Sequence, residues 1–462
     1  MSTDPVRTGI VVRCVLFLLL LLAAGLATLA LLRVGSSDSM HLSTCVAPQR
    51  AGDTPQAVLA APSRFDCDRQ EAKWGPGSYW VRLTPPPGRS WAPPGDDGVP
   101  RIQFVPQWQR MLAVYARDTS GRIVTRDLDN VVISHMVGIG GAVVLELEGH
   151  KAPLREVLFR VDGAVNNRGL IGPVHLVSSR QTHADELAAT AIFAGFAGLG
   201  IGLFCYNFVL WLTIRERFQL TYCASLVTKL AYVWTSSGMM AITFPGIPQD
   251  WRMATSFALL ACLAALTMKF ITDVIEPGMI PSRLRWVARN YGLLMLLGGA
   301  GLAMAPADWR YLADRAYVYC FVPLPFMVMA LTFLAWRRGS QAVRVLAIGW
   351  AVPLVTAIIR LAYALHLIPF GPAVQYSLVI GMGGEALLAS LAMSYRIKLI
   401  SAERDRARAD EQAARHLANV DSLTGLLNRR ALLDQVVAWA SPEPLRLLII
   451  DIDHFKQVND TH

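Results

Sequence analysis

Near its C-terminal end the chain reads Arg446-Leu-Leu-Ile-Ile-Asp-Ile-Asp-His-Phe-Lys-Gln-Val-Asn-Asp460. The apolar run Leu447–Ile450 is short, rich in β-branched residues and preceded by Pro442 and Pro444, so it predicts a buried strand. Two carboxylates, Asp451 and Asp453, come directly after it at the strand's carboxyl end, where a parallel α/β sheet usually binds its ligand. Oxygen ligands suit Mg²⁺, and Mg²⁺ suits phosphates. The pattern therefore predicts a magnesium and phosphate site at this strand end.

A second motif, Asp421-Ser-Leu-Thr-Gly-Leu-Leu-Asn-Arg-Arg430, lies upstream. At this spacing the two motifs resemble the opening of a GGDEF domain, the diguanylate cyclase family, over about residues 419–462. The resemblance implies an α/β domain, residues 421–462 being its N-terminal fragment, that makes cyclic di-GMP from two GTP. The family's Gly-Gly-Asp/Glu-Glu-Phe turn and second metal carboxylate would lie beyond His462. The chain as given is therefore expected to be inactive alone.

The resemblance also assigns a metal site. Asp451 would bind Mg²⁺ through its carboxylate and Ile452 through its backbone carbonyl. For Asp453 two interpretations stay open, direct ligation of the metal or a cap on the next turn.

Substrate contacts are implied by the same resemblance. The backbone around His454 and Phe455 would approach the phosphates of GTP, and Lys456 would add positive charge nearby. Asn459 would hydrogen-bond the edge of the guanine base.

The composition indicates a membrane protein. The chain has 462 residues, of which 53% are hydrophobic and 17% charged, with a mean hydropathy of +0.39. A soluble globular chain carries about 25% charged residues. The net charge of +9 is therefore interpreted as membrane topology. No stretch resembles a nucleic-acid module, so no nucleic-acid partner is expected.

Residues 1–34 predict export. Arg7 and Arg13 precede an apolar run, Cys14–Leu32, which is long for a signal peptide and just long enough to span a bilayer. A cleaved signal peptide and an uncleaved signal anchor both fit. Either one places the next segment of the chain in the periplasm.

Residues 35–183 predict an all-β sandwich or jelly roll, because short strand-like runs alternate with Pro- and Gly-rich turns. With Tyr79-Trp80-Val-Arg-Leu83 near its start, the segment resembles the extracellular domain of bacterial seven-transmembrane receptors with diverse intracellular signalling modules. The resemblance implies an unknown small periplasmic ligand, with carbohydrates as one class. The expected strands are 78–83, 101–105, 111–117, 131–136, 142–147, 156–161 and 174–178.

Two cysteines, Cys45 and Cys67, lie in the exported segment, and the other five lie in apolar runs. An oxidising periplasm favours a disulfide between them. Neither their spacing nor their neighbours indicate a metal site.

Residues 187–395 predict a seven-helix transmembrane bundle in contact with membrane lipid, since each apolar run is near the twenty or so residues a bilayer needs. Arginines concentrate in one set of connections, so the positive-inside rule puts the β domain outside the bacterial inner membrane and the C-terminus in the cytoplasm. The spans are expected at 187–214, 219–243, 253–275, 286–306, 316–336, 343–367 and 373–395.

Two ionisable residues, Lys229 and Glu385, fall deep inside these spans, where charges are expensive and usually face a partner. Counted along their helices, the two lie at similar depths. They are therefore predicted to be neighbours inside the bundle. Arg360 and His366 lie near the outer boundary, where snorkelling explains them.

Residues 396–420 predict a helix that continues from the last span. Ile400, Ala407 and Ala414 recur every seven residues, which is typical of a weak coiled-coil seam and favours a homodimer. A solvated single helix is the alternative for the isolated segment.

The leading interpretation is a membrane sensor coupled to a diguanylate cyclase. A second class is a ligand-binding seven-transmembrane receptor without a working catalytic output. A histidine kinase fits poorly, because His416 is isolated and no phospho-acceptor helix is present. Reading the coding sequence past His462 would separate the first two classes.

Overall fold

The computed structural model describes residues 39–91, 99–150, 152–165, 167–368, 372–437, 448–451 and 453–461. The chain divides into two compact units, Met1–Ser394 and Tyr395–His462. The first unit contains a β domain (residues 40–177) and a helical bundle (the helices from Ser179 to Ser394).

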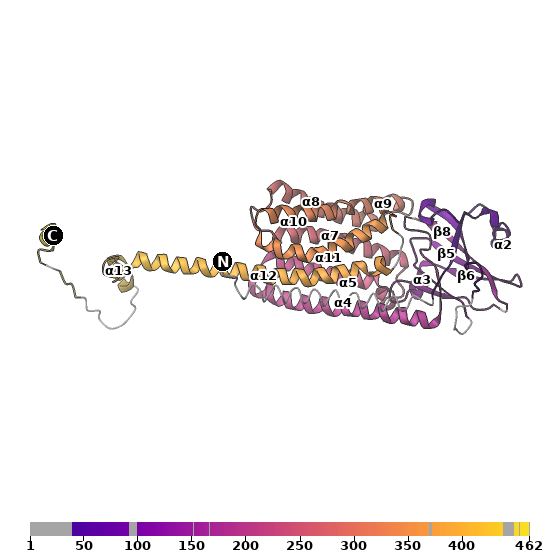
Figure 1. The fold of residues 1–462 in the computed structure, drawn as a ribbon, viewed down its shortest axis with the longest axis horizontal. Helices are drawn as coiled ribbons and strands as arrows, with labels where there is room; N and C mark the ends of the chain where they lie inside the picture. The colour runs from indigo at the N-terminus through magenta and orange to yellow at the C-terminus, as the bar shows by residue number, and fades with distance from the viewer. Residues whose placement is uncertain are drawn as a thin grey trace. The chain divides into compact units, whose positions relative to one another are not determined.

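The β domain consists of two antiparallel sheets (Figure 1). One sheet has the order β1 (Met40–His41), β9 (His175–Val177), β4 (Arg101–Phe104) and β7 (Val143–Glu146). The other has the order β2 (Ser43–Pro48), β3 (Gly77–Thr84), β8 (Leu154–Ala164), β5 (Met111–Asp118) and β6 (Ile123–Leu128).

The five-stranded sheet buries side chains on both faces, because successive residues of a strand point to opposite sides. Val81 of β3 lies opposite Phe159 of β8, and both belong to the core shared with the other sheet. The neighbouring Trp80 lies in a second cluster with Tyr115, on the side of the short helix α2 (Pro55–Leu59). Trp80 is fully buried and is therefore a core residue. Two 3₁₀ turns, Pro62–Arg64 and Glu71–Trp74, complete this region.

The strand expected at 131–136 is wrong, since these residues form helix α3 (Asn130–Met136). The carboxylate of Asp129 caps the helix by accepting hydrogen bonds from the backbone N–H of Val131 and Val132, at 2.9 and 2.7 Å. Only the adjacent residues Ile133 and Ser134 of this helix are buried, and Ile133 belongs to the core of the β domain. The cap outweighs the β propensity of the valines.

The bundle is built from helices that run side by side in Figure 1. Each expected span overlaps at least one helix, and the second and fifth spans each overlap two. Gly238, in the left-handed region at φ 88°, separates α5 from α6, and Pro323, which lacks an N–H, begins α10. The helices are α4 (Ser179–Ile214), α5 (Arg217–Ser236), α6 (Met239–Thr243), α7 (Gln249–Val274), α8 (Ser282–Ala303), α9 (Arg310–Phe321), α10 (Pro323–Arg337), α11 (Gln341–Ala364) and α12 (Pro372–Asn419).

Among the described residues, four stretches are long and apolar enough to cross a membrane: Ser179–Ile214, Gln249–Val274, Ala307–Arg337 and Val374–Asn419. The other helices are too short or too polar to meet this criterion, for local reasons. α5 carries many polar residues on its buried side, and α8 begins with an arginine-rich turn. α11 contributes a shorter apolar segment, Val352–Ala364.

Helix α12 is tied to its neighbours by directional polar contacts. The hydroxyl of Tyr222 in α5 donates to the backbone oxygen of Ala386. The side-chain amide of Asn207 in α4 donates to the hydroxyl of Ser390 at 3.0 Å. Both contacts lie on buried surfaces, where unmade hydrogen bonds are costly. They therefore fix the axial position of α12 against α4 and α5.

The β domain docks on the bundle through backbone atoms. The N–H of Gly140 donates to the carbonyl oxygen of Ser237 at 2.8 Å. A Cβ placed on Gly238 would lie 2.5 Å from the carbonyl oxygen of Gly138, so the two segments meet where only glycine fits. A second contact joins Arg168 of the β domain to Asp314 of α9 at 2.7 Å.

The second unit contains the end of α12, then α13 (Arg429–Val437) and α14 (Phe455–Thr461). The strand expected at 447–450 does not form over its described part, 448–450, and these residues are 82% exposed. No described strand pairs with them, and a lone strand leaves its backbone groups and apolar faces unsatisfied.

Candidate functional site

The upstream motif folds into a compact turn. One carboxylate oxygen of Asp421 accepts hydrogen bonds from the N–H of Leu423 and from the N–H and hydroxyl of Thr424, at 3.2, 2.9 and 2.9 Å. These bonds favour the charged carboxylate and lower the pKa of Asp421. Gly425 closes the turn in the left-handed region, at φ 71°. The motif therefore forms a hydrogen-bonded turn.

Asn428 joins the turn to two helices. Its side-chain amide donates to the carbonyl oxygen of Ala418, near the end of α12, at 2.7 Å. Its side-chain oxygen accepts the N–H of Ala431 at 3.0 Å and so caps the start of α13. One residue thus links the helix that leaves the membrane segment to the next helix.

The residues expected to bind metal and nucleotide lie together in sequence but do not converge from several elements. Asp451 and Asp453 flank Ile452, which lies outside the described residues, and both are exposed. His454 lies in the left-handed region, at φ 58°, just before α14. Three further expected residues are exposed on α14, namely Phe455, Lys456 and Asn459.

This segment does not by itself supply a metal site. The described residues contain no group of three His, Cys, Asp or Glu side chains that could hold an ion. Two neighbouring carboxylates leave most of the octahedral shell of Mg²⁺ without protein ligands. The two carboxylates described here would therefore supply only part of such a shell.

The two cysteines of the β domain are joined in the structure. The sulfur atoms of Cys45, in β2, and Cys67 lie 2.03 Å apart as a disulfide. Beside them Val46 and Asp66 exchange two backbone hydrogen bonds, each of 2.9 Å. The bond therefore fastens the segment after α2 to the edge of the five-stranded sheet.

The intramembrane pair is also in contact. The ammonium nitrogen of Lys229, in α5, lies 3.1 Å from a carboxylate oxygen of Glu385, in α12. The Lys229 side chain is 1% exposed and that of Glu385 is 15% exposed. The ring of Tyr222 lies 6.0 Å from the ammonium group. Such a pair holds only because each charge compensates the other.

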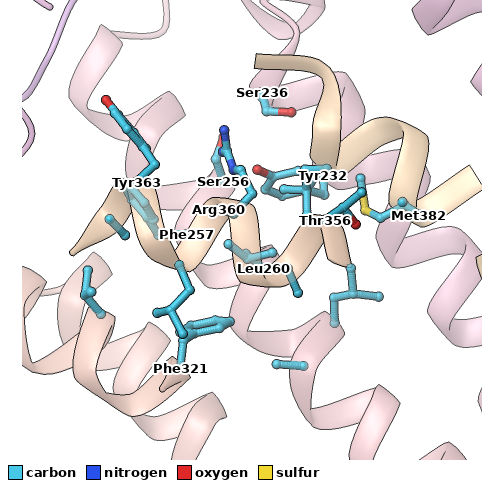
Figure 2. Close-up of a pocket in the computed structure, with 18 of the residues that line it drawn as sticks. Tyr232, Ser236, Ser256, Phe257, Leu260, Phe321, Thr356, Arg360, Tyr363 and Met382 are labelled. Carbon is cyan, nitrogen blue, oxygen red and sulfur yellow. The ribbon is translucent and has the colours of Figure 1, made fainter. Parts of the chain in front are cut away.

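A cavity of about 420 Å³ lies in the bundle and is bordered by Glu385 (Figure 2). No motif named above predicts it. A signal is nonetheless present in α7, where Gln249, Arg252 and Ser256 recur at helical spacing and share one face. In the sequence, Arg252 is distinguished only as a charged residue directly before the expected span 253–275.

Two family models match this chain. Residues 189–396 match the 7TM diverse intracellular signalling family, and residues 418–462 match the diguanylate cyclase GGDEF domain. The expected combination of a seven-transmembrane receptor module with a GGDEF domain is thereby confirmed. The GGDEF match is short and partial.

Curated relatives share only a short segment. An uncharacterized signaling protein of Caulobacter vibrioides is 48% identical over 60 residues, covering 12% of this chain and 7% of that protein. Uncharacterized proteins of Mycobacterium bovis and Mycobacterium tuberculosis are 49% identical over 55 residues, covering 11% of this chain and 9% of theirs. The match thus spans less than a tenth of the curated relatives.

Proposed function

We propose that this chain is the sensing and transmitting part of a membrane-bound diguanylate cyclase. The observation that carries the proposal is the presence of both family matches in one chain, with the single helix α12 overlapping the end of one and the start of the other. A signal received by the bundle would thus reach the GGDEF domain through continuous backbone. In the complete protein the output is the synthesis of cyclic di-GMP from two GTP.

The proposed division of the chain rests on its hydropathy and motifs. It comprises a signal segment (1–34), a periplasmic β domain (35–183) that takes a small ligand, a seven-span bundle (187–395), a helical linker (396–420) and the GGDEF segment (421–462). The arginine-rich connections would face the cytoplasm. Alkaline phosphatase fused after Val177 should be active, and fused after Asn419 inactive. The reverse pattern would overturn the orientation.

The catalytic roles proposed for the complete protein rest on the family match. Asp451 would take part in binding a divalent metal, with Mg²⁺ expected, and Asn459 would select guanine. The neighbouring His454, Phe455 and Lys456 would lie beside the phosphates. Because each cyclase domain supplies one nucleotide, the active species is proposed to be a homodimer.

The test uses membranes that contain the full-length protein, with GTP and Mg²⁺, and measures cyclic di-GMP by mass spectrometry. Asp451→Asn is expected to abolish product, because the substitution removes the charge that would face the metal. Asp434→Asn, an exposed position in α13, is the matched control and should keep wild-type activity. Synthesis by Asp451→Asn would refute the metal assignment. Absence of product from the wild type would favour a receptor without catalytic output.

A further inference from the structure

The cavity in the bundle has the size of a small-molecule site. Its volume of about 420 Å³ lies within the roughly 300–1,000 Å³ of ligand pockets. Residues of α5, α7, α9, α10, α11 and α12 line it, together with residues of the β domain. Both parts of the first unit therefore contribute to its lining.

One end of the cavity is polar. Helix α7 begins at Gln249, and its first turns present Gln249, Arg252 and Ser256 to the cavity. Arg252 donates to the side-chain oxygen of Gln249 at 2.9 Å and to the backbone oxygen of Thr235 at 3.0 Å. The side-chain nitrogen of Gln249 is buried and has no partner among the described residues. A buried donor of this kind calls for an acceptor.

Arg360, near the end of α11, adds a second guanidinium to this region. It donates to the backbone oxygen of Val374 at 3.1 Å. Arg360 lines the same cavity as Ser256 and Tyr232, and all three are labelled in Figure 2. The N-terminal turn of α7 and the C-terminal turn of α11 thus bring their polar groups to the same end of the bundle.

The charge of the lining is uneven. Of its four charged residues, Arg168 is paired with Asp314 at 2.7 Å, and Glu385 is paired with Lys229 at 3.1 Å. The other two, Arg252 and Arg360, form no ion pair with a carboxylate of the described residues. Among the described residues, the cavity therefore holds two positive charges without a neighbouring negative one.

The rest of the cavity is apolar. Leu260 and Leu263 continue the cavity face of α7 beyond Ser256, and Phe321 and Met382 approach from α9 and α12. Figure 2 shows Leu260 and Phe321 on the side away from Ser236 and Ser256. A ligand that fills this space needs a polar head and an apolar body.

The β domain contributes to the lining of the cavity. Its lining residues include Gln107, Gly140, Gly141 and Arg168. Gly140 also makes the backbone contact with Ser237 that docks the β domain on the bundle. A ligand in the cavity therefore contacts the β domain and the helices at once.

We propose that this cavity binds a small amphipathic monocarboxylate. Its carboxylate faces Arg252 and Arg360, and its hydrocarbon body lies between Leu260 and Phe321. Guanidinium groups pair with carboxylates in charge-assisted hydrogen bonds, and such pairing offsets the cost of burying charge. The site is separate from the small-ligand site proposed for the β domain and from the GGDEF segment. It does not depend on cyclase activity.

The test measures binding rather than catalysis. Residues 1–462 are placed in phosphatidylcholine nanodiscs, and radiolabelled decanoate is titrated by equilibrium dialysis against empty nanodiscs. Saturable binding with one site per chain is expected. Decanol and decylamine carry the same chain without the negative charge, and each should bind at least tenfold more weakly. Equal binding of decanol, or only unsaturable uptake into lipid, would overturn the proposal.

Two variants locate the site. Arg360→Gln should weaken decanoate binding at least tenfold and leave decanol binding unchanged, whereas Arg337→Gln, an exposed arginine that ends α10, should change neither. Unchanged decanoate affinity in Arg360→Gln would refute the assignment. If that variant does not purify as a folded protein, Leu260→Trp decides, because the larger ring fills the apolar end. It should abolish decanoate binding, and retained binding would overturn the proposal.

Discussion

Gly238→Ala is expected to loosen the joint between the β domain and the bundle. The new Cβ would lie 2.5 Å from the carbonyl oxygen of Gly138 and 3.0 Å from a methyl group of Val137. The first of these atoms belongs to the backbone, so the two segments must separate. Overpacking of this kind costs roughly 1–3 kcal/mol. The left-handed conformation, φ 88°, adds roughly 1–2 kcal/mol for an L residue. The total is about 2–5 kcal/mol.

Gly278→Ala is the matched control, because Gly278 has a similar φ of 83° and a Cβ added there would meet no atom within 4 Å. It should lose only the conformational part, about 1–2 kcal/mol. Thermal unfolding of the purified chain in detergent, with protease sensitivity of the residues after Gly238, measures both variants. The reasoning would be refuted if Gly238→Ala were no less stable than Gly278→Ala.

The disulfide, the intramembrane ion pair and a buried histidine each give a further prediction. Reducing the Cys45–Cys67 disulfide, whose partners are 22 residues apart, should cost the β domain about 3 kcal/mol on the chain-entropy model. Mass spectra of the purified protein, alkylated before reduction, would contradict the bond if both thiols carried the alkyl group. Glu385→Gln should destabilise the bundle by about 3–5 kcal/mol, because it leaves Lys229 buried without a counter-charge. In the same thermal assay, the swapped pair Lys229→Glu with Glu385→Lys should recover part of this loss. Burial lowers the pKa of His175, so the folded β domain takes up a proton on this imidazole less readily than the unfolded chain does. The stability of the β domain should therefore fall as pH drops below about 6.5. An equally acid-sensitive melting temperature in His175→Gln would contradict this.

Patterns of hydrophobicity predict most elements of the first unit. The runs at 111–117 and 156–161 form strands β5 and β8, because their alternating or continuous apolar residues fit a sheet buried on both faces. Strand β6 is missed because its middle residues are exposed and polar. Helix α3 is missed because a single capping residue, Asp129, decides against the β propensity of the sequence after it.

The candidate sites differ in how far the sequence could predict them. Lys229 and Glu385 could be paired from their expected depth in the membrane alone, because the position of a residue along a spanning helix gives its depth in the bilayer. The cavity could not be predicted from the sequence, since Arg252 and Arg360 are 108 positions apart. Only the folding of the bundle brings α7 and α11 to the same cavity. For the GGDEF segment, the two motifs indicate the family. They do not predict the geometry of the site, because that depends on how several elements of the fold pack together.

The polar contacts of α12 have a mechanical consequence. Ala386, Ser390 and Ser394 are spaced one helical turn apart, and each faces a hydrogen-bonding side chain of α4 or α5. A small axial displacement of α12 would break these bonds. A displacement of one full turn, about 5.4 Å, would not restore all of them, because Ala386 has no side-chain oxygen to replace the Ser390 hydroxyl opposite Asn207. The three contacts therefore favour one axial position of α12, and a shift of this helix along its axis has to break them together.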